Sequence, residues 1–136
     1  MSDSSWPVQQ AIYSKLLAGT SFTNLVGTRL YDHVPVSPDP ATFPYVEVGE
    51  STGEPYDTKT ERGFEQTVVM HTWSRQRGRR EVKQIHAAMY GLLHRGTLSG
   101  TGFNFVNLEN EFNEIFSDPD GLTYHGIQRY RVVTQD

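Results

Sequence analysis

Residues 64–73 read FEQTVVMHTW, and this stretch decides the fold. It is rich in β-branched and aromatic residues, which is typical of a β-strand. A second strand is predicted at 45–50, where YVEVGE alternates between apolar and polar residues. Between them, residues 51–63 (STGEPYDTKTERG) are polar and include two glycines and a proline, which predicts a projecting loop. The two strands should therefore form a hairpin with that loop at its tip.

The C-terminal part of the chain predicts a second hairpin. Strands are expected at 103–116 (FNFVNLENEFNEIF) and 122–133 (LTYHGIQRYRVV), because the SDPDG segment between them carries the proline and glycine of a tight turn. A shorter strand is expected at 29–34 (RLYDHV). The four prolines of 35–44 then predict a surface loop, since proline removes ladder donors.

Two helices complete the prediction. The first follows a pair of candidate capping serines and ends at Gly19, with apolar residues recurring on one face. The second is expected over 76–94, with Ser74 as its N-cap. Residues 20–28 predict a turn-rich link whose apolar side chains lie under the core. The pattern predicts one α+β domain over 1–136, with a mainly antiparallel sheet of four to five strands and two helices packed on one face.

Composition excludes several classes of protein. The chain has 136 residues, a length typical of one domain with its own core. It has no cysteine, which excludes disulfide bonds and thiolate metal ligands. Its start lacks the regions of a signal peptide, and no apolar run approaches the length of a membrane span. We therefore expect a protein of the cytoplasm, or one assembled there, without a membrane partner.

One segment matches a catalytic motif. GESTG at 49–53 fits the nucleophile elbow of serine hydrolases, with Ser51 as the nucleophile. That motif depends on a tight turn from strand to helix, which lifts the serine above the sheet. Here Pro55 and polar residues without helical periodicity follow the serine. The glycines therefore favour a hairpin loop, no catalytic residue is predicted, and a serine hydrolase is a remote alternative.

The histidines give no indication of a metal site. They stand at 33, 71, 86, 94 and 125, and no two have the i, i+4 spacing of a helical zinc site. His71 lies in a predicted strand, where we expect it to pack or to form a hydrogen bond. The DPDG segment at 118–121 lacks the later ligands of a calcium loop. The sequence therefore predicts neither a metal nor a cofactor.

Basic residues concentrate at 75–83 (RQRGRREVK), which carries a net charge of +4 and leaves −8 for the rest of the chain. An acidic chain is a poor general binder of polyanions, because affinity for nucleic acid comes largely from neutralised phosphates. A nucleic-acid-binding module on this run is one alternative, and a solvated charged turn is another. Cations at the start of a helix oppose its macrodipole, which suggests a use outside the helix. We expect contacts with an acidic subunit or partner from Arg75, Arg77, Arg79 and Arg80.

Acidic residues line one predicted strand. Glu109 and Glu111 alternate in phase, and Arg129 and Arg131 share a phase in the neighbouring strand. If the strands pair, the arginines lie across from the glutamates. A solvated strand face is the simplest interpretation. The alternative is that Glu109 and Glu111 line a channel or form a docking face for basic partners.

The ordered set of segments resembles a known family. It comprises the strand FPYVEVGE, the polar loop DTKT, a long strand closing in HTWSR, a helix opening at GRRE, and the hairpin DPDGLTYHG. Over nearly all of 8–134 the chain resembles the tail-terminator, or tail-completion, proteins of long-tailed bacteriophages and gene transfer agents.

The resemblance implies a structural virion protein, without cofactor or catalysis, that assembles as a hexameric ring at the neck between tail and head. Such a ring caps the tail tube, ends its polymerisation, and meets the head connector or stopper protein, while DNA passes through unread. The major tail-tube protein is the expected partner, and the tape-measure protein is a further candidate. Another neck or tail-tube component is the alternative function. Interface residues are expected in the polar loop, beside the four arginines already named: Glu54, Tyr56, Asp57, Lys59, Glu61 and Arg62.

Overall fold

The computed structural model describes residues 3–34 and 42–136. Along the chain the elements are α1 (Ser5–Ala18), α2 (Thr20–Val26), β1 (Leu30–Tyr31), β2 (Tyr45–Pro55), β3 (Gly63–Ser74), α3 (Arg80–Leu93), β4 (Asn104–Ser117) and β5 (Tyr124–Gln135). The strands form one sheet in the order β1-β2-β3-β5-β4, and only the β1–β2 pair is parallel. The predicted α+β class with a mainly antiparallel sheet is confirmed.

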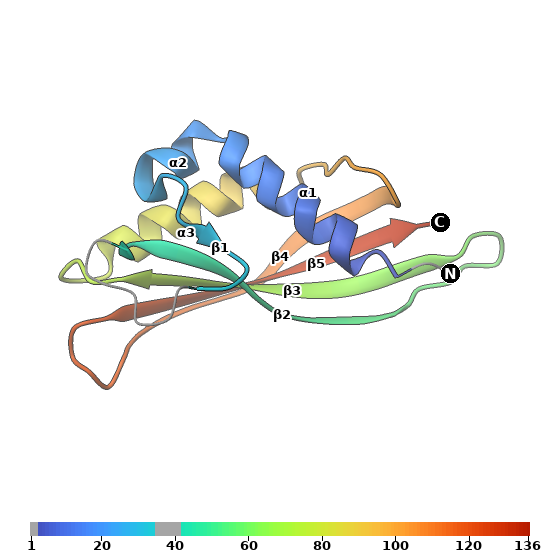
Figure 1. The fold of residues 1–136 in the computed structure, drawn as a ribbon. Coiled ribbons are helices and arrows are strands. Elements are labelled where there is room, and N and C mark those ends of the chain that lie inside the picture. Colours follow the sequence, from blue (N-terminus) through green and yellow to red (C-terminus); the bar gives the residue numbers. More distant parts are fainter. Residues whose placement is uncertain (1–2, 35–41) are drawn as a thin grey trace.

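All three helices lie on one face of a long, twisted sheet (Figure 1). The central strand β3 shows why, because its residues alternate strictly between buried and half-buried positions. Val68 and Met70 point toward the helices and are buried with Ile12 and Ile85. Val69 and His71 point to the opposite face and stay partly exposed. Period-two alternation therefore builds a two-layer molecule with one covered and one uncovered sheet face.

Helix α3 lies unusually close to β5. A Cβ atom at Gly126 would lie only 2.4 Å from the Nε2 atom of His86 and 2.5 Å from a methyl group of Val82. The Nε2 atom of Gln128 donates a hydrogen bond to the backbone oxygen of His86 at 3.2 Å. Glycine at this position is therefore what lets the helix approach the strand.

The helical part of the prediction needs two corrections. The expected link over 20–28 contains a helix, α2, whose Phe22 and Val26 are buried as anticipated. Seven residues are too few for a clear periodic signal, and their fold depends on packing against α3. The last helix begins at Arg80 instead of 76, because Gly78 adopts a φ of +90°. Ser74 is therefore no N-cap: it ends β3, and its hydroxyl donates to Glu81.

The strand boundaries also differ from the prediction. The strand expected at 29–34 is reduced to Leu30–Tyr31. Strand β2 continues through a bulge to Pro55, so the loop expected at 51–63 shrinks to the tip at 56–62. Cross-strand pairing with β3 outweighs the low strand propensity of glycine and proline there. The loop expected at 35–44 falls largely outside the described residues.

Candidate assembly surfaces

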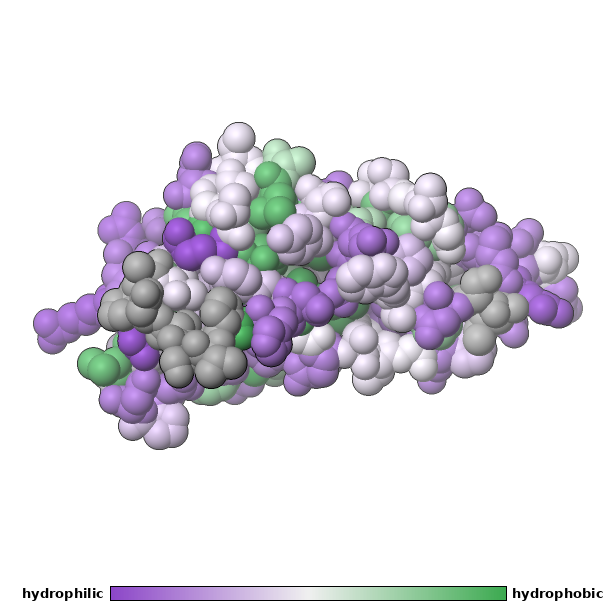
Figure 2. Space-filling model, in the orientation of Figure 1, coloured by the Kyte–Doolittle hydropathy of each residue, from purple (hydrophilic) through white to green (hydrophobic). Residues whose placement is uncertain are grey.

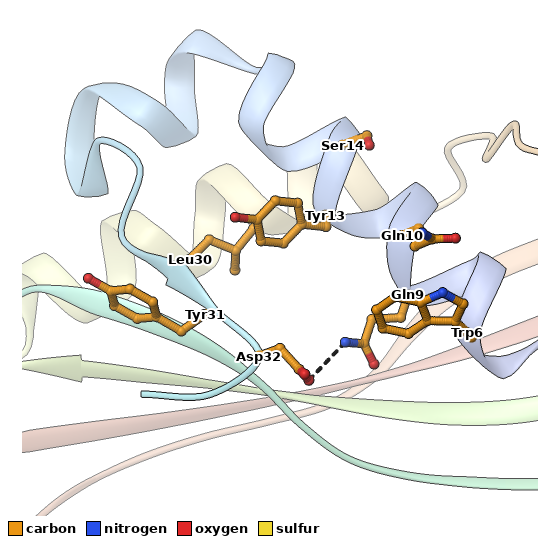
Figure 3. A pocket seen from close by; sticks show the side chains of 8 residues that line it. All are labelled: Trp6, Gln9, Gln10, Tyr13, Ser14, Leu30, Tyr31 and Asp32. Carbon is orange, nitrogen blue, oxygen red and sulfur yellow. Dashed lines mark hydrogen bonds between the residues drawn. The ribbon is translucent and has the colours of Figure 1, made fainter. Parts of the chain in front are cut away.

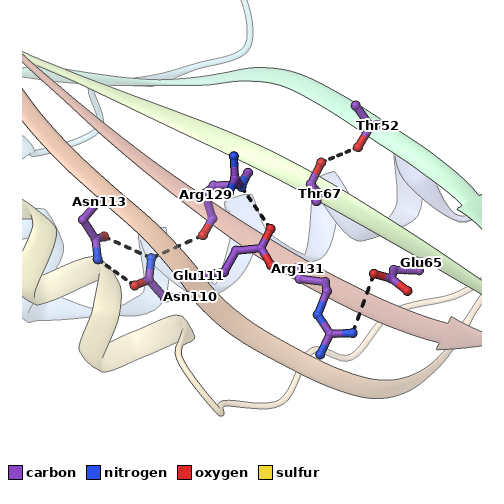
Figure 4. Close-up of polar contacts among 8 residues, drawn as sticks. All are labelled: Thr52, Glu65, Thr67, Asn110, Glu111, Asn113, Arg129 and Arg131. Carbon is purple, nitrogen blue, oxygen red and sulfur yellow. Dashed lines mark hydrogen bonds and ion pairs between the residues drawn. The ribbon is translucent and has the colours of Figure 1, made fainter.

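The uncovered face of the sheet carries a ladder of opposite charges (Figure 4). The Nε atom of Arg129 donates to Glu111 across 3.0 Å, and its guanidinium also lies over the ring of Phe112. Arg131 lies between two carboxylates, at 3.7 Å from Glu65 on β3 and 3.9 Å from Glu109 on β4. The predicted cross-strand arrangement is therefore confirmed.

One end of the same face holds a cluster of aromatic and histidine rings. The Trp73 ring stacks on the His125 ring, with centroids 3.7 Å apart, and Phe116 meets the same histidine edge-on. The Nδ1 atom of His71 lies 2.7 Å from Nε2 of His125, and its Nε2 contacts Glu50. The prediction that His71 packs and forms hydrogen bonds is confirmed.

Protonation of this cluster follows from its contacts. The hydrogen bond from His71 lowers the pKa of Glu50, so the carboxylate is ionised at neutral pH and can only accept. Nε2 of His71 is therefore the donor in that bond. Burial, and secondarily the nearby His71, lowers the pKa of His125 to about 4. His125 is thus neutral at neutral pH and suited to stacking on Trp73.

The four arginines of the basic run fall into two pairs. Arg75 lies over the ring of Phe43 at 4.3 Å, and Arg79 lies over the ring of Tyr124 at 5.3 Å. Both guanidinium groups therefore already make cation–π contacts within the subunit. Arg77 and Arg80 are exposed and form no ion pair with any described residue. The free pair is the part of the run that remains available to a partner.

The other predicted interface residues lie at the tip of the β2–β3 hairpin, apart from Glu54 in the adjoining end of β2. It is closed by its own hydrogen bonds, from the amide of Tyr56 to the oxygen of Gly63 and from the amide of Gly63 to Asp57. The tip is therefore closed by hydrogen bonds within the subunit. All six side chains predicted there are exposed: Glu54, Tyr56, Asp57, Lys59, Glu61 and Arg62.

The two sets of predicted interface residues do not form one site. The hairpin tip lies at one end of the elongated molecule, beside both termini, and the basic turn lies at the other end (Figure 1). Glu109 and Glu111 lie on the uncovered sheet face between them. Hydrophilic side chains gather at both ends, and hydrophobic ones show only in small areas of the visible surface (Figure 2).

A groove between α1 and the sheet edge had no counterpart in the sequence prediction (Figure 3). Its volume is about 470 Å³, and its walls include Trp6 and Tyr13 from α1 and Tyr31 from β1. The Nε2 atom of Gln9 donates to Asp32 across 2.9 Å and links the two walls. The sequence did hold one indication of this groove, because the aromatic residues of α1 lie outside the buried apolar face of that helix.

The remaining candidates are placed as follows. Ser51 lies inside strand β2, opposite Val68, and not on a turn leading into a helix. Residues 3–34 and 42–136 contain no group of three or more acidic or histidine side chains able to hold a metal ion. Within the same residues, no helix is long and apolar enough to cross a bilayer.

The fold and these surfaces define a small α+β protein whose contact-forming groups lie on an open sheet face and at two charged ends. The sequence pattern of the family "Tail completion protein gp17" matches residues 10–135, so the chain belongs to that family. Tail completion protein gp17 of Bacillus phage SPP1 is 32% identical over 89 residues. The match spans 65% of this chain and 66% of that protein's length. The resemblance inferred from the sequence is confirmed.

Two solved structures share the fold. A chain from the virion of a native gene transfer agent particle superposes with a TM-score of 0.89 at 23% identity, over 100% of both chains. The structure of bacteriophage SPP1 gp17 superposes with a TM-score of 0.60 at 24% identity, over 97% of this chain and 95% of that one. The overall fold of this chain is therefore shared with both structures.

Proposed function

We propose that this protein is a structural component of a phage or gene-transfer-agent particle, with no catalytic role. In this proposal it forms a hexameric ring that caps the tail tube, ends tail polymerisation and joins the tail to the head connector or stopper. Membership of the tail completion family and the likeness to a chain of a gene transfer agent particle support the particle role. The ring would lie at the neck, assemble in the host cytoplasm and let DNA pass through.

Exposed groups of opposite charge at the two ends of the subunit carry the ring proposal. Arg77 and Arg80 are free at one end, while Glu61 is exposed at the other. A contact between different ends of identical subunits is heterologous, and it closes into a ring when the rotation per subunit allows. Bidentate pairing of arginine with carboxylate would fix the orientation of such a contact.

Charge reversal tests the contact. Arg77→Glu with Arg80→Glu should abolish rings seen by negative-stain electron microscopy and light scattering, because like charges then meet at every junction. Thr60→Arg with Glu61→Arg should do the same from the opposite end. Mixing the two variants should restore rings, since alternating subunits again pair opposite charges and a hexamer can alternate.

The control adds acidic residues elsewhere on α3, as Gln84→Glu with Ala87→Glu, and should leave rings intact. Circular dichroism should show that every variant remains folded. Rings that survive the Arg77 and Arg80 reversal, or a mixture that fails to assemble, would contradict the proposed contact.

Purified tail-tube protein separates capping from the alternative roles. A cap added to polymerising tube subunits should shorten the tubes and bind at one end only. Incorporation along the tube would instead identify a tube component, and binding only to connector protein would identify another neck component.

A further inference from the structure

The sheet has an unpaired edge beside the groove. Strand β1 pairs only with Val46 and Glu47 of β2, through Leu30 and Tyr31. Beyond Glu47, no strand among the described residues pairs with the outer edge of β2, which runs on to Pro55. The backbone groups of such an edge are available to an added strand.

The groove lies on the helix side of the sheet between α1 and β1, at the start of this edge, and no residue of β2 lines it (Figure 3). Trp6 is 59% exposed, and besides this groove it lines a second, smaller depression that reaches β2 at Ser51. Gln66 of β3 belongs to the lining of that second depression. Gln66 is only 2% exposed, and its Oε1 atom accepts no hydrogen bond from any described residue. A buried acceptor without a donor beside a groove favours a partner that brings a donor.

The surroundings of the edge are acidic. The described segments that border it, residues 3–14, 30–34 and 42–58, contain no lysine or arginine. Glu54 lies directly opposite Glu65 in the strand register, an unfavourable like-charged pair. Glu54 is exposed and has no ion pair among the described residues. The acidic groups in these segments are Asp3, Asp32, Glu47, Glu50, Glu54 and Asp57.

The same charges argue against pairing with a second copy. The other edge strand of the sheet is β4, and it also carries glutamates on its uncovered face, among them Glu109 and Glu114. Joining β2 of one copy to β4 of another would place acidic rows side by side. A strand that complements this edge must instead be basic.

We propose that the smaller depression between Trp6 of α1 and Ser51 of β2 binds an extended basic segment of another protein, which adds to the sheet as a strand beside residues 48–55. Alternate side chains of that segment point to the two sides of the sheet. Lysines or arginines on the uncovered side meet Glu50 and Glu54. Small side chains on the helix side enter the depression against Trp6, where a hydroxyl group among them donates to Oε1 of Gln66. The site belongs to one subunit, so it does not depend on the proposed ring.

The test uses short synthetic peptides and the full-length subunit, kept monomeric by dilution. The probe is an eight-residue peptide of alternating lysine and threonine. One control peptide replaces every lysine with glutamate, and a second carries N-methyl groups on alternate amides so that one edge cannot form strand hydrogen bonds. Binding is followed by backbone amide shifts in NMR spectra and by titration calorimetry.

The lysine peptide should shift the amides of residues 48–55 and of α1, while both control peptides should bind at least about tenfold more weakly. Equal binding of the glutamate or N-methylated peptide would overturn the proposal. Absence of any binding at low salt, or shifts confined to β4, would overturn it as well. Concentration-dependent shifts of 48–55 without peptide would assign the edge to a second copy instead.

Variants of the subunit complete the experiment. Glu54→Lys and Trp6→Ala should each weaken binding of the lysine peptide by about tenfold. The first substitution removes a charge contact, and the second removes an aromatic contact. The matched control Glu114→Lys reverses a charge on the other acidic edge and should change the affinity less than about twofold. A Glu114→Lys effect equal to that of Glu54→Lys would show non-specific attraction to an acidic protein and would contradict the site.

Discussion

The two faces of the sheet differ in how strongly the stability of the fold depends on the identity of each side chain. On the covered face, α3 approaches β5 so closely that Gly126 has no room for a methyl group. On the uncovered face, Arg129 and Glu111 meet at a distance of 3.0 Å with substantial exposure to solvent. In a closely packed interface, a small change in side-chain shape lowers the stability of the fold, whereas an exposed ion pair adds little to it. The covered face therefore carries the stability of the fold, and the uncovered face is free to vary for assembly.

The largest expected effect comes from acid acting on the covered face. Burial lowers the pKa of His86 from 6.5 to about 4, so the folded state resists a proton that the unfolded state binds. Stability should be complete above about pH 6.5, fall as the pH drops toward 4, and change little with this group below that. The loss at His86 is on the order of 3 kcal/mol. Urea unfolding at pH 7 and at intervals down to pH 4.5 measures it.

A non-titrating variant assigns this effect to its residue. His86→Gln should flatten the dependence of unfolding free energy on pH between 6.5 and 4.5, even if it lowers the stability at pH 7. The slope should not vanish, because the lowered pKa values of His125 and Glu50 add in the same direction. An unchanged slope in His86→Gln would show that α3 does not hold this histidine neutral.

Glycine substitutions give the next largest contrast. Gly126→Ala places a Cβ atom against His86 and Val82, which should lower the unfolding free energy by about 2 kcal/mol through overpacking. Gly91 lies in α3 with nothing within 4 Å of its would-be Cβ, so Gly91→Ala should raise stability by about 0.5–1 kcal/mol. Thermal unfolding of both variants checks the signs. A neutral Gly126→Ala would mean that α3 can move away from β5 without cost.

Sequence reasoning found what strong periodicity and pairing determine. β3, β4, β5 and most of α3 follow from apolar patterning over ten or more residues, and the Arg131–Glu109 contact follows from strand phase alone. Helix α2 was missed because seven residues give little periodicity. The extension of β2 to Pro55 was missed because pairing with β3 overrides the local preference of its polar residues.

The candidate surfaces were predictable to a smaller degree. The basic run was visible as a cluster of arginines, but its division into ring-bound and free pairs depends on contacts of Arg75 with Phe43 and of Arg79 with Tyr124. Those partners are distant in sequence, and no local pattern connects them. The groove between α1 and β1 was not predicted for the same reason, since these elements form it only after the chain folds.

The smallest effect is expected from the exposed pair on the uncovered face. A double-mutant cycle with Arg129→Met and Glu111→Gln should give a coupling energy of about 0.5 kcal/mol, because solvent screens the charges. The coupling should shrink further at 1 M salt, where the Debye length falls to about 3 Å. Urea unfolding of the four proteins measures it. A coupling above about 2 kcal/mol would erase the distinction between the faces, since both would then contribute strongly to the fold. A small value would instead leave Arg129 and Glu111 free to change with a binding partner at little cost to the subunit.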